Sequence, residues 1–304
     1  MTTEADINSE EMANEVCASC GKAALDEIKL KKCACNLVKY CTVDCQKYHR
    51  PQHKKACKKR MAEIRDDRLF TQPDETYLGE CPICCLPHSL DITQSMINSC
   101  CCKIICDGCD YANKIREEEQ GLEHKCPFCR EPKPETDEEA FGNLMERMKA
   151  NDAVALNQLG KTCYHEGDYE GAFQYYTKAA KLGDIEVHWN LAGLYGEGQG
   201  VEKDEKKAVY HLEEAAIGGH PSARHNLGCE EKEKGRIDRA LKHWIIAANL
   251  GHDEALAMVK QGFQIGDVSK EEYASSLRGH QAAVDATKST QREEAEKAKQ
   301  EGLL

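Results

Sequence analysis

Apolar positions follow a helical spacing over the C-terminal part of the chain, and the pattern occurs three times. The lines KAAKLGD, EEAAIGGH and IAANLGH each end such a segment, and their central alanines, Ala180, Ala216 and Ala248, lie 36 and 32 residues apart. Each unit is typical of helix, turn and helix, with glycine at the helix ends where a left-handed cap needs it. A period of this length predicts a solenoid in which each unit buries its apolar face against the next.

A weaker fourth unit, DEALAMVKQGFQIGDVSKEEYASSLRGH, follows the third and is expected to cap the array. We expect the repeat region to span residues 153–280. The remaining segment, residues 281–304, is charged and helix-prone, and we expect it to be a solvated tail.

The first third of the chain shows the opposite pattern, because it holds almost nothing to bury. From Lys39 to Cys57 the sequence KYCTVDCQKYHRPQHKKAC contains three cysteines and two histidines, and Val43 is its only aliphatic residue larger than alanine. A hydrophobic core therefore cannot fold this segment. A structural zinc ion supplies folding free energy on the order of 10 kcal/mol, so metal binding is the expected substitute.

Cysteine usage supports this interpretation. The chain has 304 residues and nineteen cysteines, of which seventeen lie between Cys17 and Cys129. In a reducing compartment such a density favours metal sites over disulfides. The two outlying residues, Cys163 and Cys229, fall in helical patterns and are expected to be small buried apolar side chains.

Charge and hydropathy limit the setting. The formal net charge of −12 gives the whole chain no attraction to nucleic acid or anionic lipid. No apolar run approaches the roughly 20 residues of a membrane span, and no secretory signal stands at the start. We therefore expect a cytoplasmic or nuclear protein with no membrane partner.

Ligand spacing in residues 17–57 predicts two zinc ions. Cysteines separated by one to three residues let one turn offer two sulfur atoms to one ion, and His53 and Cys57 would lie one turn apart on a helix face. The eight candidate ligands are Cys17, Cys20, Cys33, Cys35, Cys41, Cys45, His53 and Cys57.

The string YCTVDCQKYHRPQHKKAC resembles the MYND finger, which runs Tyr-Cys-x3-Cys-Gln and then His-x3-Cys. The resemblance implies one zinc on Cys17, Cys20, Cys41 and Cys45, and the other on Cys33, Cys35, His53 and Cys57. The chain departs from the family at Cys33-Ala-Cys35, where two residues usually separate the cysteines, and at Arg50, where tryptophan is common. His49 is expected on the surface. The family implies a module that binds short, often proline-containing peptides.

This segment is also basic, since residues 17–60 hold twelve Lys or Arg against three Asp or Glu. Such a surface could attract an acidic partner or nucleic acid. We take the excess charge to offset the thiolates and keep the finger soluble. No aromatic row or base-reading helix accompanies it, so we expect no nucleic acid partner.

A second cysteine-rich segment, residues 81–130, contains CPIC, SCCCK, CDGC and CPFC, and resembles a RING-type cross-brace with two zinc ions. The resemblance implies one ion on Cys81, Cys84, Cys106 and Cys109, and the other on Cys126, Cys129 and two of Cys100, Cys101 and Cys102. The family's usual histidine falls on Lys103, which cannot bind zinc as an ammonium ion. Spacing does not decide between the three adjacent cysteines, and we favour Cys100 and Cys101. Cys85 has no ligand position, and His88 and His124 are expected in loops.

In the RING family this fold performs no covalent chemistry, but docks a ubiquitin-conjugating enzyme and holds its thioester-linked ubiquitin in a reactive pose. The resemblance implies that Ile83 and Pro127 form the apolar contact and that Arg130 holds ubiquitin against the conjugating enzyme. The alternative is that Ile83 and Pro127 only shape their zinc turns and that Arg130 is a solvated charge.

The repeats resemble Sel-one-like repeats, relatives of the tetratricopeptide repeat. The second unit carries that family's Tyr-x-x-Gly-x-Gly-Val-x-x-Asp-x-x-Lys-Ala string within GLYGEGQGVEKDEKKAVYHLEEAAIGG, while the first and third lack the Gly-Val loop. The resemblance implies a protein-binding scaffold.

The sequence thus predicts small zinc-stabilised α+β fingers followed by an all-α helical-repeat solenoid, with about four zinc ions per chain, two in each finger. The expected segments are a disordered N-terminus (1–16), a MYND-type finger (17–57), a linker (58–80), a RING-like finger (81–130), an acidic linker and helix (131–152), the repeats (153–280) and the tail (281–304).

Two functions fit this order of segments. In the first, the chain is a RING-type ubiquitin ligase that recruits substrate through the MYND finger and the repeats. In the second, it is a non-catalytic adaptor that uses all three modules to bind proteins. We expect no catalytic side chain in either case, because each zinc ion would be closed by four protein ligands and would hold no reactive water.

Overall fold

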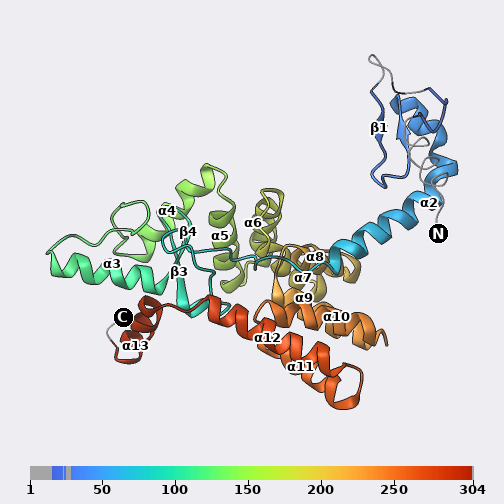
Figure 1. The fold of residues 1–304 in the computed structure, drawn as a ribbon. Coiled ribbons are helices and arrows are strands. Elements are labelled where there is room, and N and C mark those ends of the chain that lie inside the picture. Colours follow the sequence, from blue (N-terminus) through green and yellow to red (C-terminus); the bar gives the residue numbers. More distant parts are fainter. Residues whose placement is uncertain (1–15, 23, 25–28, 303–304) are drawn as a thin grey trace. The chain divides into compact units, whose positions relative to one another are not determined.

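The computed structural model describes residues 16–22, 24 and 29–302 (Figure 1). The chain divides into two compact units, residues 1–71 and residues 72–304, and each is described here by itself. Residues 1–15, which make up most of the N-terminal segment expected to be disordered, lie outside the described residues.

The first unit pairs two short strands with one long helix. Strands β1 (Lys31–Lys32) and β2 (Lys39–Tyr40) are antiparallel, with Lys31 opposite Tyr40. Helix α2 (Val43–Leu69) begins at Thr42, whose hydroxyl accepts a hydrogen bond from the Cys45 N–H at 3.1 Å. Its buried cluster consists of Cys17, Cys33, Cys35 and Tyr40. Cysteine therefore fills the interior that aliphatic side chains fill elsewhere.

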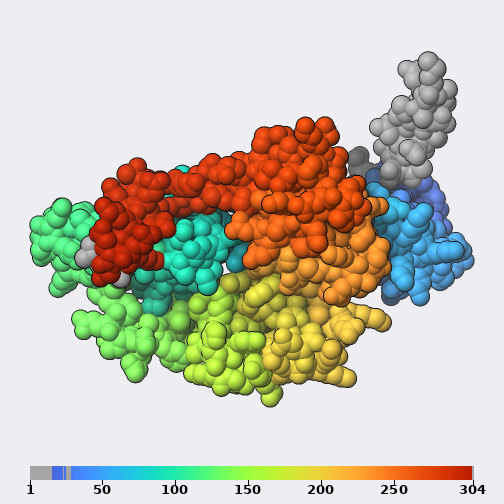
Figure 2. Space-filling model, turned by 90° about the horizontal axis from the view of Figure 1, so that it is seen from below, coloured from blue at the N-terminus to red at the C-terminus, as the bar shows by residue number. Residues whose placement is uncertain are grey.

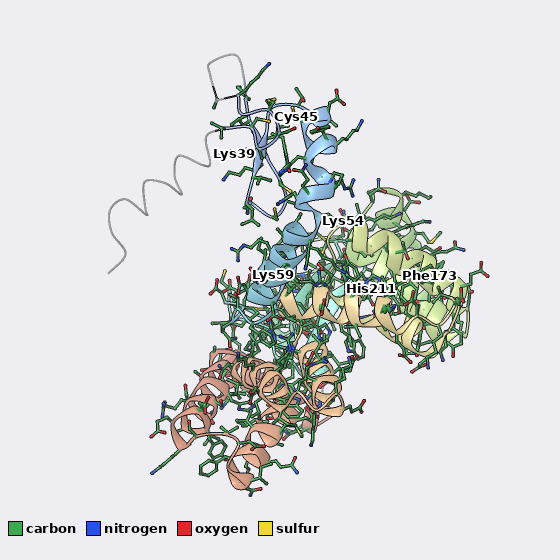
Figure 3. The ribbon with its side chains drawn as sticks, turned by 90° about the vertical axis from the view of Figure 1, so that its right-hand side faces the viewer. Lys39, Cys45, Lys54, Lys59, Phe173 and His211 are labelled. Carbon is green, nitrogen blue, oxygen red and sulfur yellow. The ribbon has the colours of Figure 1, made fainter. Side chains whose placement is uncertain are left out.

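Helix α2 continues twelve residues beyond Cys57, into the segment expected to be a linker. The sequence KKRMAEIRDDRL consists mostly of strong helix formers, which explains the extension. Figure 3 shows Lys54 and Lys59 further along this helix than Cys45, which lies near its start.

The second unit opens with the RING-like finger. Strands β3 (Ser95–Asn98) and β4 (Lys103–Cys106) form an antiparallel hairpin after a single 3-10 turn, η1 (Ile92–Gln94). Helix α3 (Asp107–Glu119) follows directly. Its buried cluster is Cys81, Ile105, Cys106 and Cys109, so only one aliphatic side chain contributes to it.

Helix α4 (Asp137–Lys149) leads into four antiparallel helical hairpins (Figure 1). They are α5 (Ala153–His165) with α6 (Tyr169–Lys181), α7 (Glu186–Glu197) with α8 (Glu205–Ile217), α9 (Pro221–Glu233) with α10 (Ile237–Asn249), and α11 (Asp253–Ile265) with α12 (Lys270–Ala286). The predicted fold class is confirmed: small cysteine-rich fingers with short strands precede an all-helical repeat region.

Alanine and glycine set the close spacing of these helices. Ala216 and Ala248 are fully buried, and Ala180 is partly buried. The glycines of the three repeated lines, Gly183, Gly219 and Gly251, take left-handed φ angles of +92°, +84° and +91°, which end each second helix as expected. The two cysteines of this region, Cys163 and Cys229, are partly buried against the hydrophobic clusters.

The expected linker does not hang free of the repeats. The Tyr77 N–H donates to the Gly219 carbonyl at 3.1 Å, and the Tyr77 ring stacks on His220 with centroids 4.2 Å apart. The Asn249 amide donates to the Gln72 side chain at 3.2 Å. Residues 72–79 therefore run across the turns of successive repeats and tie the RING-like finger to them.

The expectation of a solvated tail is wrong for its last helix. Helix α13 (Thr290–Gln300) packs against α3, and Figure 2 shows it, in dark red, against the surface of the RING-like finger. Its two alanines, Ala295 and Ala298, are buried. The sequence pattern hides this contact, because two small side chains make too narrow an apolar stripe to stand out. None of the described helices is long and apolar enough to cross a bilayer.

Candidate metal centres

Sixteen cysteine and histidine side chains gather into four groups, and within each group the candidate ligand atoms lie within 4.8 Å of one another. The groups are Cys17, Cys20, Cys41 and Cys45; Cys33, Cys35, His53 and Cys57; Cys81, Cys84, Cys106 and Cys109; and Cys100, Cys101, Cys126 and Cys129. We call them sites one to four. They are the four sets named from the sequence, and the expectation of about four zinc sites is met by four clusters able to bind zinc.

The spacing of the donor atoms fits zinc. A Zn–S bond of about 2.3 Å places the corners of a tetrahedron about 3.8 Å apart. The Sγ–Sγ distances are 3.5 Å for Cys20–Cys41, 3.6 Å for Cys41–Cys45, 3.7 Å for Cys33–Cys57 and 3.8 Å for Cys84–Cys106. A disulfide would need about 2.05 Å, and every cysteine is free.

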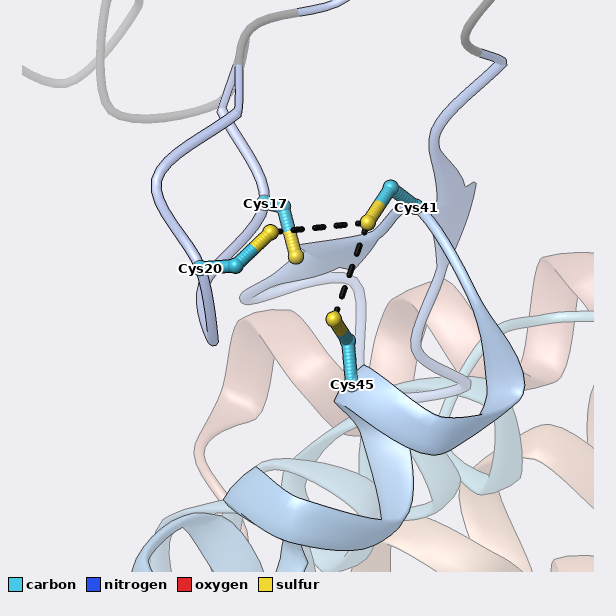
Figure 4. A group of neighbouring side chains, drawn as sticks. All are labelled: Cys17, Cys20, Cys41 and Cys45. Carbon is cyan, nitrogen blue, oxygen red and sulfur yellow. Dashed lines mark hydrogen bonds between the residues drawn. The ribbon is translucent and has the colours of Figure 1, made fainter.

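Site one joins three elements (Figure 4). Cys17 and Cys20 lie on one turn, in which the Cys17 N–H donates to the Lys22 carbonyl at 2.8 Å. Cys41 directly follows β2, and Cys45 lies in the first turn of α2. The capped start of α2 therefore fixes the fourth sulfur against the other three.

Site two is the only mixed group among the described residues, with three sulfurs and one imidazole. His53 and Cys57 lie one turn apart on α2, and the His53 Nε2 atom lies 3.1 Å from the Cys35 Sγ atom. The single residue between Cys33 and Cys35 does not prevent closure. His49 stays outside the group, half-buried, with its Nδ1 atom 3.0 Å from the Tyr40 hydroxyl.

Sites three and four are built on two matching turns. In CPIC the Cys81 N–H donates to the Leu86 carbonyl, and the Cys85 N–H donates to the Cys81 carbonyl. CPFC repeats both bonds: the Cys126 N–H donates to the Glu131 carbonyl, and the Arg130 N–H donates to the Cys126 carbonyl. The residue after each second cysteine has a left-handed backbone, with φ of +55° at Cys85 and +66° at Arg130. Each turn thus directs two sulfurs to one point, which is typical of a zinc knuckle.

The three adjacent cysteines lie in the turn between β3 and β4, which directs two of them to site four and the third away from it. Cys100 lies 3.4 Å from Cys129 and Cys101 lies 3.9 Å from Cys126, both measured between Sγ atoms. Cys102 is buried outside the group, with its thiol near the Ser99 carbonyl. His88 is buried, unlike an ordinary loop residue, and the His124 Nδ1 atom lies 2.8 Å from the Glu117 carboxylate.

Protonation matters for these groups because zinc takes thiolates and neutral imidazole. Burial, with a smaller contribution from His49, lowers the pKa of His53, so its imidazole is neutral at neutral pH. The hydrogen bond with Cys106 lowers the pKa of Cys81 to about 3, and the same contact raises the pKa of Cys106. Zinc binding at site three would displace the remaining thiol protons, because the ion takes thiolates.

The three residues expected to contact a partner lie on the knuckles. Ile83 is 41% exposed and Pro127 is half-buried. Arg130 is exposed, and its guanidinium donates to the Asn113 side chain of α3 at 3.0 Å. Sequence reasoning missed Phe128, which is 43% exposed beside Pro127 and could have been found from its place in the same Cys-x2-Cys turn.

Comparison with known families identifies two of the three modules. The MYND finger family matches residues 17–57, and the Sel1 repeat family matches residues 153–184, 185–220 and 221–252. The interpretation of residues 81–130 as RING-like rests on the cysteine groups alone.

Among curated proteins, the chain is similar to DAP3-binding cell death enhancer 1 of Rattus norvegicus, with 35% identity over 72 residues, or 24% of this chain and 14% of that protein. It is also similar to chitin synthase regulatory factor 4 of Schizosaccharomyces pombe, with 32% identity over 114 residues, or 36% of this chain and 18% of that protein. The chain thus spans less than a fifth of the length of either relative.

Two solved structures of repeat proteins are similar to parts of the chain. A Sel1 repeat protein from Oxalobacter formigenes gives a TM-score of 0.43 at 22% identity, covering 58% of this chain and 73% of that one. The antigen c5321 of uropathogenic Escherichia coli gives a TM-score of 0.38 at 18% identity, covering 63% of this chain and 40% of that one. By its own family matches, the chain carries a MYND finger followed by three Sel1 repeats, both of which are protein-interaction modules.

Proposed function

We propose that the chain is a RING-type ubiquitin ligase whose sixteen grouped cysteine and histidine side chains hold four structural zinc ions. The observation that carries the proposal is the pair of matching knuckles on the RING-like finger. Their sulfurs face inward to sites three and four, while Ile83 and Phe128 remain exposed. An exposed apolar side chain on a rigid turn suits a docking surface.

In this proposal the finger supplies position and no bond-making group. A substrate lysine amine attacks the carbonyl carbon of the thioester that links ubiquitin to the conjugating enzyme. An isopeptide bond forms, the thioester breaks, and the enzyme's cysteine leaves as a thiol. Arg130 would steady ubiquitin in this pose, and its hydrogen bond to Asn113 holds the guanidinium against the finger.

The MYND finger and the Sel1 repeats would select the substrate, since both are interaction modules. We place the protein in the cytoplasm or the nucleus, where nineteen cysteines stay reduced and available to zinc. A conjugating enzyme and peptide-bearing substrates are the proposed partners.

The test combines the purified full chain with ubiquitin, activating enzyme, ATP and a panel of conjugating enzymes. We expect zinc-dependent ubiquitin chains that fall at least tenfold in Ile83→Ala and in Arg130→Ala. Ile92→Ala is the matched control, because Ile92 belongs to the same finger, is 74% exposed and lies outside both knuckles. Equal losses in Ile83→Ala and Ile92→Ala would contradict a docking role for the knuckle.

The second candidate is the non-catalytic adaptor, which is favoured by the two interaction modules identified from the families. A folded chain that carries four zinc ions and is silent with every conjugating enzyme would support it.

A further inference from the structure

Helix α13 fits closely against the RING-like finger, although more than 150 residues separate the two along the chain. Ala295 and Ala298 are 0% and 3% exposed on an otherwise polar helix. Near the start of α13, the helix α3 approaches with Gly108, where an added Cβ would lie 2.8 Å from the Arg292 nitrogen and 2.9 Å from the Gln291 carbonyl carbon. A residue larger than glycine at position 108 would leave no room for this approach, so the backbones of α3 and α13 are in close contact here.

Arg292 extends from α13 to the knuckle of site three. Its Nη1 atom donates to the Pro87 carbonyl at 2.6 Å and to the Thr287 carbonyl at 2.7 Å. Its Nη2 atom donates to the Leu86 carbonyl at 3.2 Å and lies 3.5 Å from the Cys84 Sγ atom. One planar guanidinium thus joins the knuckle backbone to a sulfur of the site, which a lysine could not do with the same geometry.

The Leu86 carbonyl makes this contact specific to the metal site. It also accepts the Cys81 N–H at 3.0 Å, the bond that closes the knuckle. Arg292 therefore braces the same carbonyl that orients the first two sulfurs. At the other end of α13, Lys299 contacts the Thr93 carbonyl and the Asp107 carboxylate, which holds the helix in register.

Charge gives the contact a second role. A zinc ion with four thiolates carries a net charge of −2, and three of the four cysteines of site three are buried. A cationic donor beside Cys84, the half-buried member of the group, offsets part of this charge. Outer partners of this kind change metal affinity by about 10- to 100-fold.

We infer that Arg292 is a positioning residue for site three, so that the C-terminal helix completes a zinc site whose ligands lie in the RING-like finger. This inference rests on the zinc sites of the proposed function. It requires no ligase activity.

The experiment measures zinc release from the full-length, zinc-loaded chain into excess colorimetric chelator. We expect one of the four zinc equivalents to leave Arg292→Ala at least tenfold faster than it leaves the wild type. Arg292→Lys should be intermediate, because lysine keeps the positive charge but loses the two guanidinium donors. Lys297→Ala is the control, since Lys297 lies on the same helix with its side chain 76% exposed. Its release should match the wild type.

Hydrogen exchange by mass spectrometry locates the effect. In Arg292→Ala, and equally in Arg292→Lys if the alanine variant fails to fold, peptides over residues 81–88 and 106–109 should exchange faster, while residues 126–131 stay protected. Wild-type release rates, or equal loss of protection at sites three and four, would overturn the inference. A wild-type chain that binds fewer than four zinc ions would instead contradict the proposed metal sites.

Discussion

Cysteine replaces aliphatic side chains in the interior of both fingers. In the buried hydrophobic cluster of the first unit, as far as the structure describes it, Tyr40 is the only member that is not a cysteine. In the RING-like finger the corresponding cluster consists of three cysteines and Ile105. Thiols this close repel one another once ionised, so the interior is stable only when a cation holds the sulfurs together.

The ligand choice at site four gives the sharpest prediction for single residues. Cys101→Ser should lower the zinc content from four ions per chain to three, because the Cys101 Sγ atom lies with the group. Cys102→Ser should keep four, because Cys102 lies outside the group and burial raises the pKa of its thiol to about 11. Metal analysis of the purified variants measures the zinc content of each. Four zinc ions in Cys101→Ser and three in Cys102→Ser would instead make Cys102 the ligand.

At this scale the sequence predicts the residues that meet but not every orientation. Spacing alone gives eight candidate ligands in residues 17–57, and the resemblance to the MYND finger implies that four of them, Cys33, Cys35, His53 and Cys57, share one ion. Spacing could not choose among three adjacent cysteines. That choice follows from the left-handed backbone of Cys102, with φ of +55°, which only the folded hairpin imposes.

Among the elements, the repeated hairpins were the most predictable and the contacts made by their flanking segments the least. Helical period and glycine caps are local signals, so they survive in the sequence. The docking of α13 depends instead on Gly108 of a distant helix, and the extension of α2 depends on propensity rather than on an apolar face. Neither feature produces a periodic pattern of apolar residues in the sequence.

Two helix glycines should respond to alanine in opposite directions. At Gly160 the new methyl would lie 2.5 Å from the Tyr176 ring, so Gly160→Ala should destabilise the repeats by about 1–3 kcal/mol. At Gly193 no heavy atom lies within 4 Å, so Gly193→Ala should stabilise them by about 0.5–1 kcal/mol.

Urea unfolding followed by tryptophan fluorescence measures both variants, since the chain's two tryptophans, Trp189 and Trp244, lie in the repeats. A midpoint that rises in Gly160→Ala would contradict the close packing at Gly160, and one that falls in Gly193→Ala would contradict the open space at Gly193.

Across the second unit, the RING-like finger is held at two places. Residues 72–79 tie its start to the repeat turns through Tyr77, and α13 packs on its helix from the far end of the chain. The knuckles that carry Ile83 and Phe128 are therefore held relative to the repeats. In the proposed ligase, this attachment would set how far a substrate lysine on the repeats lies from a conjugating enzyme docked on the knuckles.

The second unit should lose stability in mild acid. Burial lowers the pKa of His211 and of His220 to about 4 and that of His243 to about 3, whereas an unfolded histidine titrates near 6.5. Between these values the unfolded chain binds more protons, so stability is full above about pH 6.5 and falls as the pH drops toward 4. Burial raises the pKa of Asp184 to about 6, which opposes the loss at a single site.

Thermal unfolding followed by tryptophan fluorescence tests this directly, because both tryptophans report on the repeats. The midpoint should be several degrees lower at pH 5 than at pH 7.5. An equal or higher midpoint at pH 5 would show that these histidines are not buried as neutral side chains.

The central claim is that zinc, in place of an apolar core, folds both fingers. Native mass spectrometry of the full chain, before and after treatment with a strong chelator, tests it most directly, with hydrogen exchange over residues 17–57 and 81–130 read on the same samples. We predict four zinc ions per chain and a loss of protection in both segments when they are removed. A chain with far fewer than four, or fingers that stay protected without metal, would contradict the account.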